Sequence, residues 1–171
     1  MRIYWKYFKS LVKHKWGVFR GGLIVGKIPL WRLVVHDWTK FTPWEFTRYA
    51  KNFQGDYSKS PVDRDQVAYD FHYAWLHHEN HNPHHLGYWI PRTGEHKGKP
   101  LNMWGTYVYE MVADWLGASY AYTGSFDMTV WLEENLEKHK RLMSSWTWFT
   151  TSNLLVQLGY KDIVIRLNKS N

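Results

Sequence analysis

The sequence of 171 residues contains no cysteine, and this absence excludes several kinds of site at once. Disulfide cross-links, thiol nucleophiles, CxxC zinc sites and thiolate-held iron–sulfur clusters all require cysteine. Any metal ion must therefore bind to His, Asp or Glu side chains. A chain of this length can bury one sizeable core, so we expect a single domain over residues 1–171, with residues 160–171 as a loosely attached tail.

Long apolar runs are also missing, because charged or polar residues interrupt every extended apolar stretch. The opening residues are basic but include no apolar run of signal-peptide length. We therefore expect a cytoplasmic protein with no membrane partner.

Acidic residues are in the minority: 15 Asp and Glu stand against 22 Lys and Arg, a formal charge of +7 that leaves ten His uncounted. This surplus favours anionic partners such as phosphates, nucleic acid or acidic lipid. The 12 Trp, 12 Tyr and 8 Phe are scattered along the chain, which is more typical of a helical core than of a base-stacking platform. Nucleic acid is therefore an open but less favoured partner.

Apolar residues recur at three- and four-residue spacing over most of the chain. This spacing predicts seven helices, over residues 4–19 (followed by Gly21-Gly22), 30–40, 43–53 (capped by Thr42), 63 or 65 to 81, 101–122, 128–143 and 147–158. Only residues 163–167 have a strand-like pattern, and that run has no partner. The predicted fold class is all-α, a single bundle of about six to seven helices with a long His-rich irregular region over residues 82–100.

Six of the ten histidines fall within 14 residues, as His72, His77, His78, His81, His84 and His85. On a helix, residues three or four apart share a face, and Pro83 lets His84 and His85 fold back towards the preceding turn. Any one of these histidines could be an ordinary packed helix residue. Together they favour binding of a metal ion by neutral rings or of an anion by charged ones.

Two further groups carry candidate ligands. His36 and Asp37 are adjacent at the end of an apolar helix, about 100° apart around its axis, with Lys40 within reach; the alternative is a helix-terminal His beside a solvated Asp. Asp114 lies in a nearly apolar helix one turn after Glu110, where a buried carboxylate needs a cation or a basic partner. His14 in the first helix is the remaining candidate.

In order along the chain, His14, His36-Asp37, His77-His78 and Asp114 resemble the H…HD…H…D arrangement of the HD-domain superfamily of metal-dependent phosphohydrolases. The stretch from His36 to Lys40 is similar to its HD-x-x-K signature. His77-His78-Glu79 followed by Gly87-Tyr88 resembles the HHE…GYP motif of its cyclic-dinucleotide phosphodiesterase branch, although Asn82-Pro83-His84-His85 replaces the Asp-Gly of that branch and Trp89 its proline. Over about residues 10–160 the chain more closely resembles a domain-of-unknown-function family of bacterial and bacteriophage proteins.

The resemblance to HD domains implies a role for each matching residue. His36 and Asp37 would be the central metal ligands, with Asp37 bridging two ions, and His14 and Asp114 would complete the first site. His77 and His78 would bind the second ion, with His84 and His85 as competing candidates. Asp37 and Lys40 would be catalytic, and the substrate would contact Lys40, His81, His84, His85 and Arg92.

The function that follows is a metal-dependent phosphohydrolase, with one or two ions of Mn, Fe, Co, Ni or Zn, acting on a nucleotide or small phosphoester. Two alternatives stay open: a di-iron oxygenase of the HD type, and a non-enzymatic phage protein that binds a nucleotide or a host protein. A homodimer is also open, because the apolar face of Trp131, Leu132, Leu136 and Leu142 would suit either a core or an interface.

Overall fold

The computed structural model describes residues 2–57 and 61–169, which are about 75 % helical and contain no strand. This confirms the all-α prediction. Eight α-helices and two short 3-10 helices follow one another in these residues: α1 (Arg2–Val25), α2 (Leu30–Val35), η1 (Trp38–Phe41), α3 (Pro43–Gln54), α4 (Pro61–His81), η2 (Leu86–Trp89), α5 (Gly105–Thr123), α6 (Thr129–Lys140), α7 (Ser145–Gln157) and α8 (Lys161–Lys169).

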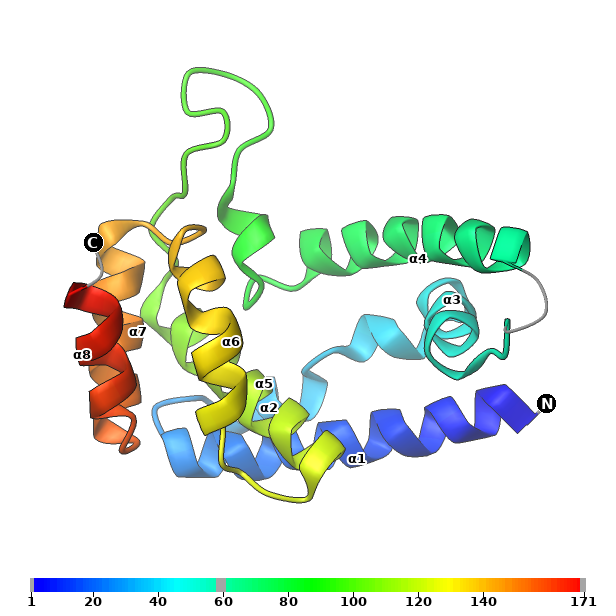
Figure 1. Ribbon diagram of the computed structural model, residues 1–171, viewed down its shortest axis with the longest axis horizontal. Coiled ribbons are helices and arrows are strands. Elements are labelled where there is room, and N and C mark those ends of the chain that lie inside the picture. Colours follow the sequence, from blue (N-terminus) through cyan, green and yellow to red (C-terminus); the bar gives the residue numbers. More distant parts are fainter. Residues whose placement is uncertain (1, 58–60, 170–171) are drawn as a thin grey trace.

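Figure 1 shows the arrangement of the helices, which pack around two clusters of apolar side chains. The larger cluster joins the C-terminal half of α1 to α5, α6, α7 and α8, and includes Val18 and Leu155. The smaller cluster joins the N-terminal half of α1 to α3 and α4, and includes Leu11 and Tyr49. His14 lies on α1 between Leu11 and Val18, so the two clusters meet at a predicted site residue.

Helix α1 extends to Val25, and the predicted end at Phe19 is therefore wrong. The glycines that suggested an end instead allow α1 to approach its neighbours closely. A Cβ atom on Gly17 would lie 2.8 Å from the carbonyl oxygen of Gly117 in α5, and one on Gly21 would lie 2.9 Å from Cβ of Leu116. Small residues are required here because the two helix backbones are almost in contact.

The predicted start of α3 is confirmed. Thr42 Oγ1 accepts a hydrogen bond from the backbone N–H of Glu45, and Pro43 occupies the first turn, as expected for a capped helix. This cap fixes the position at which Glu45 enters the helix, and Glu45 is fully buried.

The predicted helix over residues 30–40 is interrupted in the middle. Helix α2 ends at Val35, His36 adopts an extended ψ of 132°, and Asp37 lies in the left-handed region at φ 54° and ψ 27°. The chain then resumes as η1. Non-glycine residues rarely adopt positive φ, although Asp tolerates it better than most. His36 and Asp37 are therefore presented by a sharp turn and not by a helix face.

Other boundaries also differ from the prediction. Within residues 82–100 the chain forms η2, and the next helix begins at Gly105 instead of Leu101. The strand-like residues 163–167 belong to α8, whose Val164 is buried in the larger cluster, because an apolar run too short to show a period suits either structure. Leu132 and Leu136 are core residues, at 1 % exposure each, whereas Leu142 is 44 % exposed.

Candidate metal centre

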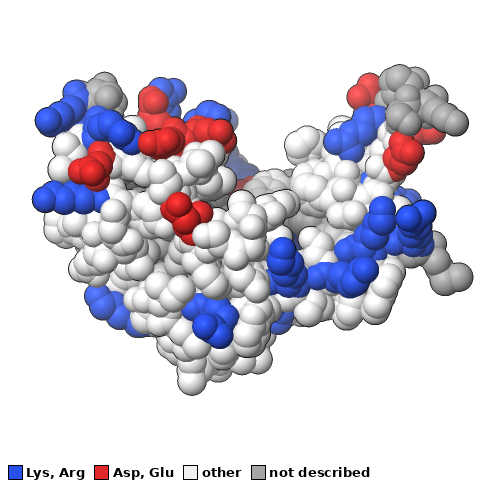
Figure 2. All heavy atoms as spheres, turned by 60° about the horizontal axis from the view of Figure 1, so that its bottom comes forward, with Lys and Arg blue, Asp and Glu red and all other residues white. Residues whose placement is uncertain are grey.

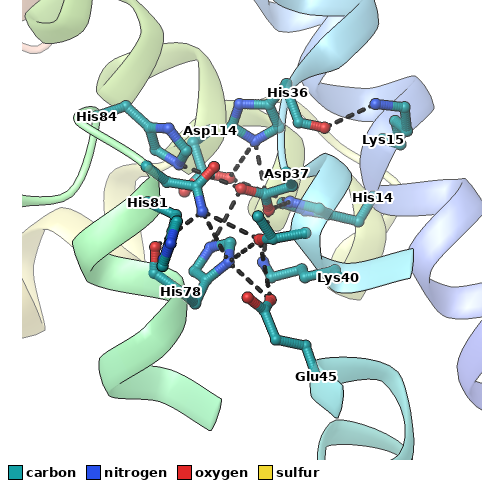
Figure 3. A network of polar contacts seen from close by, with 12 residues as sticks. His14, Lys15, His36, Asp37, Lys40, Glu45, His78, His81, His84 and Asp114 are labelled. Atoms are coloured by element: carbon teal, nitrogen blue, oxygen red, sulfur yellow. Dashed lines mark hydrogen bonds and ion pairs between the residues drawn. The ribbon is translucent and has the colours of Figure 1, made fainter. Parts of the chain in front are cut away.

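Seven His and Asp side chains from five segments converge at the junction of the two clusters. Figure 3 labels all of them except His85. They are His14 from α1, His36 and Asp37 from the turn between α2 and η1, His78 from α4, His84 and His85 from the turn after α4, and Asp114 from α5. They form two groups that share Asp37, and within each group the potential ligand atoms all lie within 4.8 Å of one another.

The first group contains His14, His36, Asp37 and Asp114. Asp114 Oδ1 lies 3.1 Å from Nε2 of His14 and 3.4 Å from Nε2 of His36. Asp37 Oδ2 lies 3.6 Å and 3.5 Å from the same two nitrogens. Two imidazole nitrogens and two carboxylate oxygens thus surround one small volume.

The second group contains Asp37, His78, His84 and His85. The other carboxylate oxygen of Asp37, Oδ1, lies 3.2 Å from Nε2 of His78 and 3.3 Å from Nε2 of His84. Asp37 therefore directs one oxygen at each group and stands between them.

The seven residues fit a metal centre by a further criterion. Seven of their polar atoms are buried and make no hydrogen bond: Nε2 of His14, His36, His78, His84 and His85, and Oδ1 of Asp37 and Asp114. Each buried polar atom left unpaired costs about 1–3 kcal/mol. Two further atoms of this kind in the described residues, Arg48 Nε and the Tyr49 hydroxyl, lie outside the two groups. Most of the unpaired buried atoms thus belong to His and Asp side chains that could hold a metal ion.

A buried glutamate on α5 orients two of these histidines. Glu110 Oε1 lies 3.1 Å from Nδ1 of His36 and 3.6 Å from Nδ1 of His84. Its other oxygen accepts two hydrogen bonds from the Arg32 guanidinium, at 2.6 and 2.9 Å. A carboxylate on Nδ1 fixes the tautomer that leaves Nε2 free to bind a metal. The sequence left open whether a basic residue pairs with the acidic residues of this helix. Arg32 is such a residue, but it pairs with Glu110 and not with Asp114.

Glu45 on α3 has the same role on the other side. Its Oε2 lies 3.0 Å from Nδ1 of His78 and accepts a hydrogen bond of 3.0 Å from Thr39 Oγ1, while Oε1 lies 2.7 Å from Nδ1 of His77. Sequence reasoning did not identify Glu45, Thr39 or Arg32 as site residues. The one signal was the Thr42-Pro43-x-Glu45 pattern, which indicated a helix start and gave no reason to look for a buried carboxylate.

Lys40 lies next to Asp37, and its Nζ donates a hydrogen bond of 2.5 Å to Asp37 Oδ2. Burial would raise the pKa of the Asp37 carboxyl, but His36, Lys40 and His78 hold it well below its usual range. Burial would likewise lower the pKa of Lys40, but Asp37 and Asp114 raise it. Both groups are therefore charged at neutral pH.

The imidazoles differ in their protonation. Burial lowers the pKa of His84, and burial together with His84 and His78 takes the pKa of His85 well below its usual range. Both rings are therefore neutral at pH 7, the form that binds metals. Burial would also lower the pKa of His36, but Asp37, Asp114 and Glu110 override it and raise the pKa to about 10.

Three predicted site residues lie away from the two groups. His77 uses Nδ1 to contact Glu45, and the side chain of His81 is exposed with Nδ1 2.7 Å from the carbonyl oxygen of His77. Arg92 is exposed and donates to the side chain of Asn80 at 3.2 Å. The structure thus brings together His14, His36, Asp37, Lys40, His78, His84, His85 and Asp114, and does not bring His77, His81 or Arg92 to them.

A cavity of about 300 Å³ opens beside the two groups. His14, Lys40, His85 and Asp114 line one end of it, and the remaining wall is mostly apolar, with Tyr7, Leu11, Tyr49, Phe53, Trp75 and Tyr122. The Tyr49 hydroxyl is buried without a hydrogen-bond partner. Burial, reinforced by Asp37 and Glu45, raises the pKa of Tyr7 and of Tyr49, so both remain protonated donors.

Comparison with known proteins places the chain in a family without assigning it an activity. No helix in the described part of the chain is long and apolar enough to cross a membrane. No curated protein and no solved structure matches the chain. Residues 3–158 match a family described as a family of unknown function (DUF5662), a match that leaves the HD-domain resemblance as a prediction. Because this match covers most of the sequence, the chain belongs to the DUF5662 family.

Proposed function

We propose that this protein is a metal-dependent phosphohydrolase that cleaves the phosphoester of a nucleotide or another small phosphoester. The observation that carries the proposal is the position of Asp37. One of its oxygens faces His14, His36 and Asp114, and the other faces His78 and His84. A carboxylate placed in this way is suited to bridge two ions.

The donor set defines which metals the site would take. All the candidate ligands are imidazole nitrogens and carboxylate oxygens, which suit Mn, Fe, Co, Ni or Zn better than Ca. Such ions, when bound, lower the pKa of a water molecule and stabilise developing charge on a phosphoryl group.

The side chains around the ligands supply the remaining requirements. The ammonium group of Lys40 lies at the edge of both the ligand groups and the cavity, where it would pair with a phosphate oxygen. The apolar wall of the cavity would hold the organic part of the ester and exclude water from it. The Tyr49 hydroxyl could donate a hydrogen bond to a polar atom of that group.

The HD-domain resemblance supports the same proposal. It implied His14, His36, Asp37 and Asp114 as one ligand set, and these four form the first group. For the second ion it left His77, His78, His84 and His85 in competition. The geometry favours His78, His84 and His85, since Nδ1 of His77 lies against Glu45.

The proposal is tested by comparing the purified protein with Asp37→Asn and with Asp65→Asn, a matched control at an exposed position of α4. Metal content is measured by plasma mass spectrometry and folding by circular dichroism. Phosphate release is then followed with nucleotides and small phosphoesters in the presence of Mn, Fe, Co, Ni or Zn. We expect metal and activity in the wild type and in Asp65→Asn, and loss of both in folded Asp37→Asn.

Other outcomes would overturn the proposal in recognisable ways. Iron-dependent oxygen consumption without phosphate release would indicate the oxygenase alternative, which uses the same ligands. Tight binding of a nucleotide with no turnover under any metal would indicate a binding protein. A folded wild type that takes up none of the five metals would rule out a metal centre.

A further inference from the structure

The charged residues are unevenly distributed along the chain. The first 55 residues contain eleven of the 22 Lys and Arg but only two of the 15 acidic residues, Asp37 and Glu45. Both of these are buried in the metal centre, at 1 % and 0 % exposure. The surface formed by this part of the chain, within the residues described, therefore carries positive charge only.

Helix α1 has a second apolar face, most of which is exposed. Its residues follow one another at intervals of three and four: Trp5, Phe8, Val12, Trp16, Phe19 and Leu23, which we call the aromatic stripe. Phe19 is partly buried, whereas Trp5 is 61 % exposed, Trp16 52 % and Leu23 52 %. Residues with this spacing share one side of a helix.

Basic residues border the aromatic stripe. The ammonium group of Lys9 lies 5.9 Å from the ring centre of Trp5, and the guanidinium of Arg20 lies 5.7 Å from that of Trp16. The bottom of Figure 1, along which α1 runs, is turned forward in Figure 2. The lower part of that view shows Lys and Arg among uncharged residues and, in the described part of the chain, no acidic side chain (Figure 2).

The exposed apolar surface continues onto the segment after α1. Leu30, Trp31 and Val34 on α2 are 60–62 % exposed, and Trp38 on η1 is 58 % exposed. Lys15 links α1 to this segment, since its Nζ donates to the carbonyl oxygen of His36 at 2.6 Å. Aromatic and aliphatic side chains thus extend across α1, α2 and η1.

We propose that this surface binds to anionic lipid bilayers, with α1 lying in the plane of the interface. Tryptophan is enriched at the level of lipid headgroups, and interfacial helices combine such an apolar face with Lys and Arg that attract anionic lipids. No membrane-spanning run is needed for this mode of binding. The expectation of no membrane partner rested only on the lack of such a run.

Two other occupants fit the surface less well. A second copy of the chain would bring two positively charged surfaces together without acidic residues to pair with them. Nucleic acid would stack on the tryptophans but would leave the aliphatic Val12, Leu23, Leu30 and Val34 in water, because these side chains have no stacking face. A bilayer satisfies the positive charge, the tryptophans and the aliphatic residues together.

Binding through the aromatic stripe would leave the cavity accessible. The cavity is lined by Tyr7, Leu11 and His14, which lie on the side of α1 that faces the protein. Lipid binding and the metal centre thus use different faces of one helix, and one can be tested without disturbing the other.

The test is co-sedimentation of the full chain with vesicles of phosphatidylcholine alone or of phosphatidylcholine mixed with phosphatidylglycerol. We expect binding to the mixed vesicles only, weakened by salt. The double variant Trp5→Ser/Trp16→Ser should bind about tenfold more weakly, which corresponds to about 1.4 kcal/mol. Lys9→Gln and Arg20→Gln should each weaken binding about fivefold.

The matched control is Val130→Ser/Phe149→Ser, which removes equally exposed apolar side chains, at 68 % and 65 %, from α6 and α7. It should bind as the wild type does. No sedimentation with either vesicle, or equal losses in both double variants, would overturn the proposal. So would a dimer in analytical ultracentrifugation that only the stripe variant dissociates, or duplex DNA binding that requires Lys9 and Arg20 with no binding to vesicles.

Discussion

At the scale of single residues, the candidate metal centre depends on Asp37. Its backbone is held at a positive φ, its carboxylate is buried, and its two oxygens face different histidines. A left-handed conformation at a residue other than glycine costs on the order of 1–3 kcal/mol. The His36–Asp37 turn places the Asp37 side chain in the interior, where its two oxygens face different histidines.

The two buried glutamates should control metal affinity without binding the metal. We expect Glu110→Gln and Glu45→Gln each to lower affinity about 10–100-fold, the range typical for groups that orient metal-binding histidines. Glutamine retains the volume but loses the charge that holds the Nδ1 proton. Affinity is measured by competition with a chromogenic chelator.

The exposed Glu95→Gln serves as the control for both glutamate variants. It should leave the affinity unchanged. If Glu110→Gln and Glu45→Gln also bind metal as the wild type does while remaining folded, the orienting role assigned to these carboxylates is wrong.

Metal binding should also release protons. Burial opposes protonation of His36, but Asp37, Asp114 and Glu110 raise its pKa to about 10, so the metal-free protein carries a proton there at pH 7. That proton stabilises the metal-free fold fully below the unfolded pKa of about 6.5, and this contribution is lost as pH rises through about 10. A metal ion must displace it, so affinity should rise with pH over the same window.

Calorimetry in two buffers of different ionisation enthalpy measures the number of protons released. We expect about one proton per ion at His36 at pH 7. A binding enthalpy that is the same in both buffers would contradict the protonation state assigned to His36. So would an affinity that does not change between about pH 7 and about pH 9, a range that lies above the ordinary His pKa of about 6.5.

At the scale of elements, sequence periodicity identified the major helices but not their interruptions. The spacing of apolar residues over 30–40 continues through His36, so no sequence signal marked the turn there; it is set by contacts such as the Lys15 hydrogen bond to the His36 carbonyl. The glycine pair suggested an end to α1 because close helix packing cannot be distinguished from a chain break without the partner helix. Local rules therefore failed where tertiary contacts decide the conformation.

The candidate site, like the helices, could be predicted from the sequence only in part. Histidine density and the His36-Asp37 pair predicted most of the cluster, because these residue types are rare and chemically specific. Glu45 was missed because a glutamate three residues after a threonine cap has an ordinary explanation. His77 and His78 could not be separated by sequence, since adjacent helix positions differ only in which neighbour they face.

The contact between α1 and α5 should be sensitive to one added methyl group. A Cβ on Gly117 would lie 2.5 Å from the backbone nitrogen of Val18, which cannot move without shifting α1. We expect Gly117→Ala to lower the free energy of unfolding by about 1–3 kcal/mol. Gly105→Ala is the control, because its Cβ would meet only a Tyr109 ring atom at 3.9 Å; it should be neutral or stabilising by about 0.5–1 kcal/mol.

Urea unfolding measures both glycine variants. Because His14 and Asp114 are carried by α1 and α5, Gly117→Ala should also weaken metal binding, whereas Gly105→Ala should not. Equal stability of the two variants would mean that the helices are not held at the close distance described.

At the scale of the whole molecule, the candidate metal centre lies between two parts whose apolar cores differ in size. The larger apolar cluster holds α5 to α6, α7 and α8, whereas the smaller one holds α3 and α4 to the start of α1. Ligands come from both sides: His78 from α4 and Asp114 from α5. A bound ion would therefore connect elements that the apolar contacts hold less strongly.

Metal removal should accordingly destabilise the protein unevenly. At a free ion concentration 100 times the Kd, binding adds about 2.7 kcal/mol to stability, and for a domain of this size that raises Tm by about 5–10 °C. We expect chelation to reverse this rise, and Asp37→Asn to show none. Hydrogen exchange should locate the loss: amides of α3 and α4 should exchange faster without metal, while those of α7 change little because their packing does not involve the ligands. Uniform exchange across both parts would mean that the metal stabilises the fold as a single unit, and would contradict a linking role for the centre.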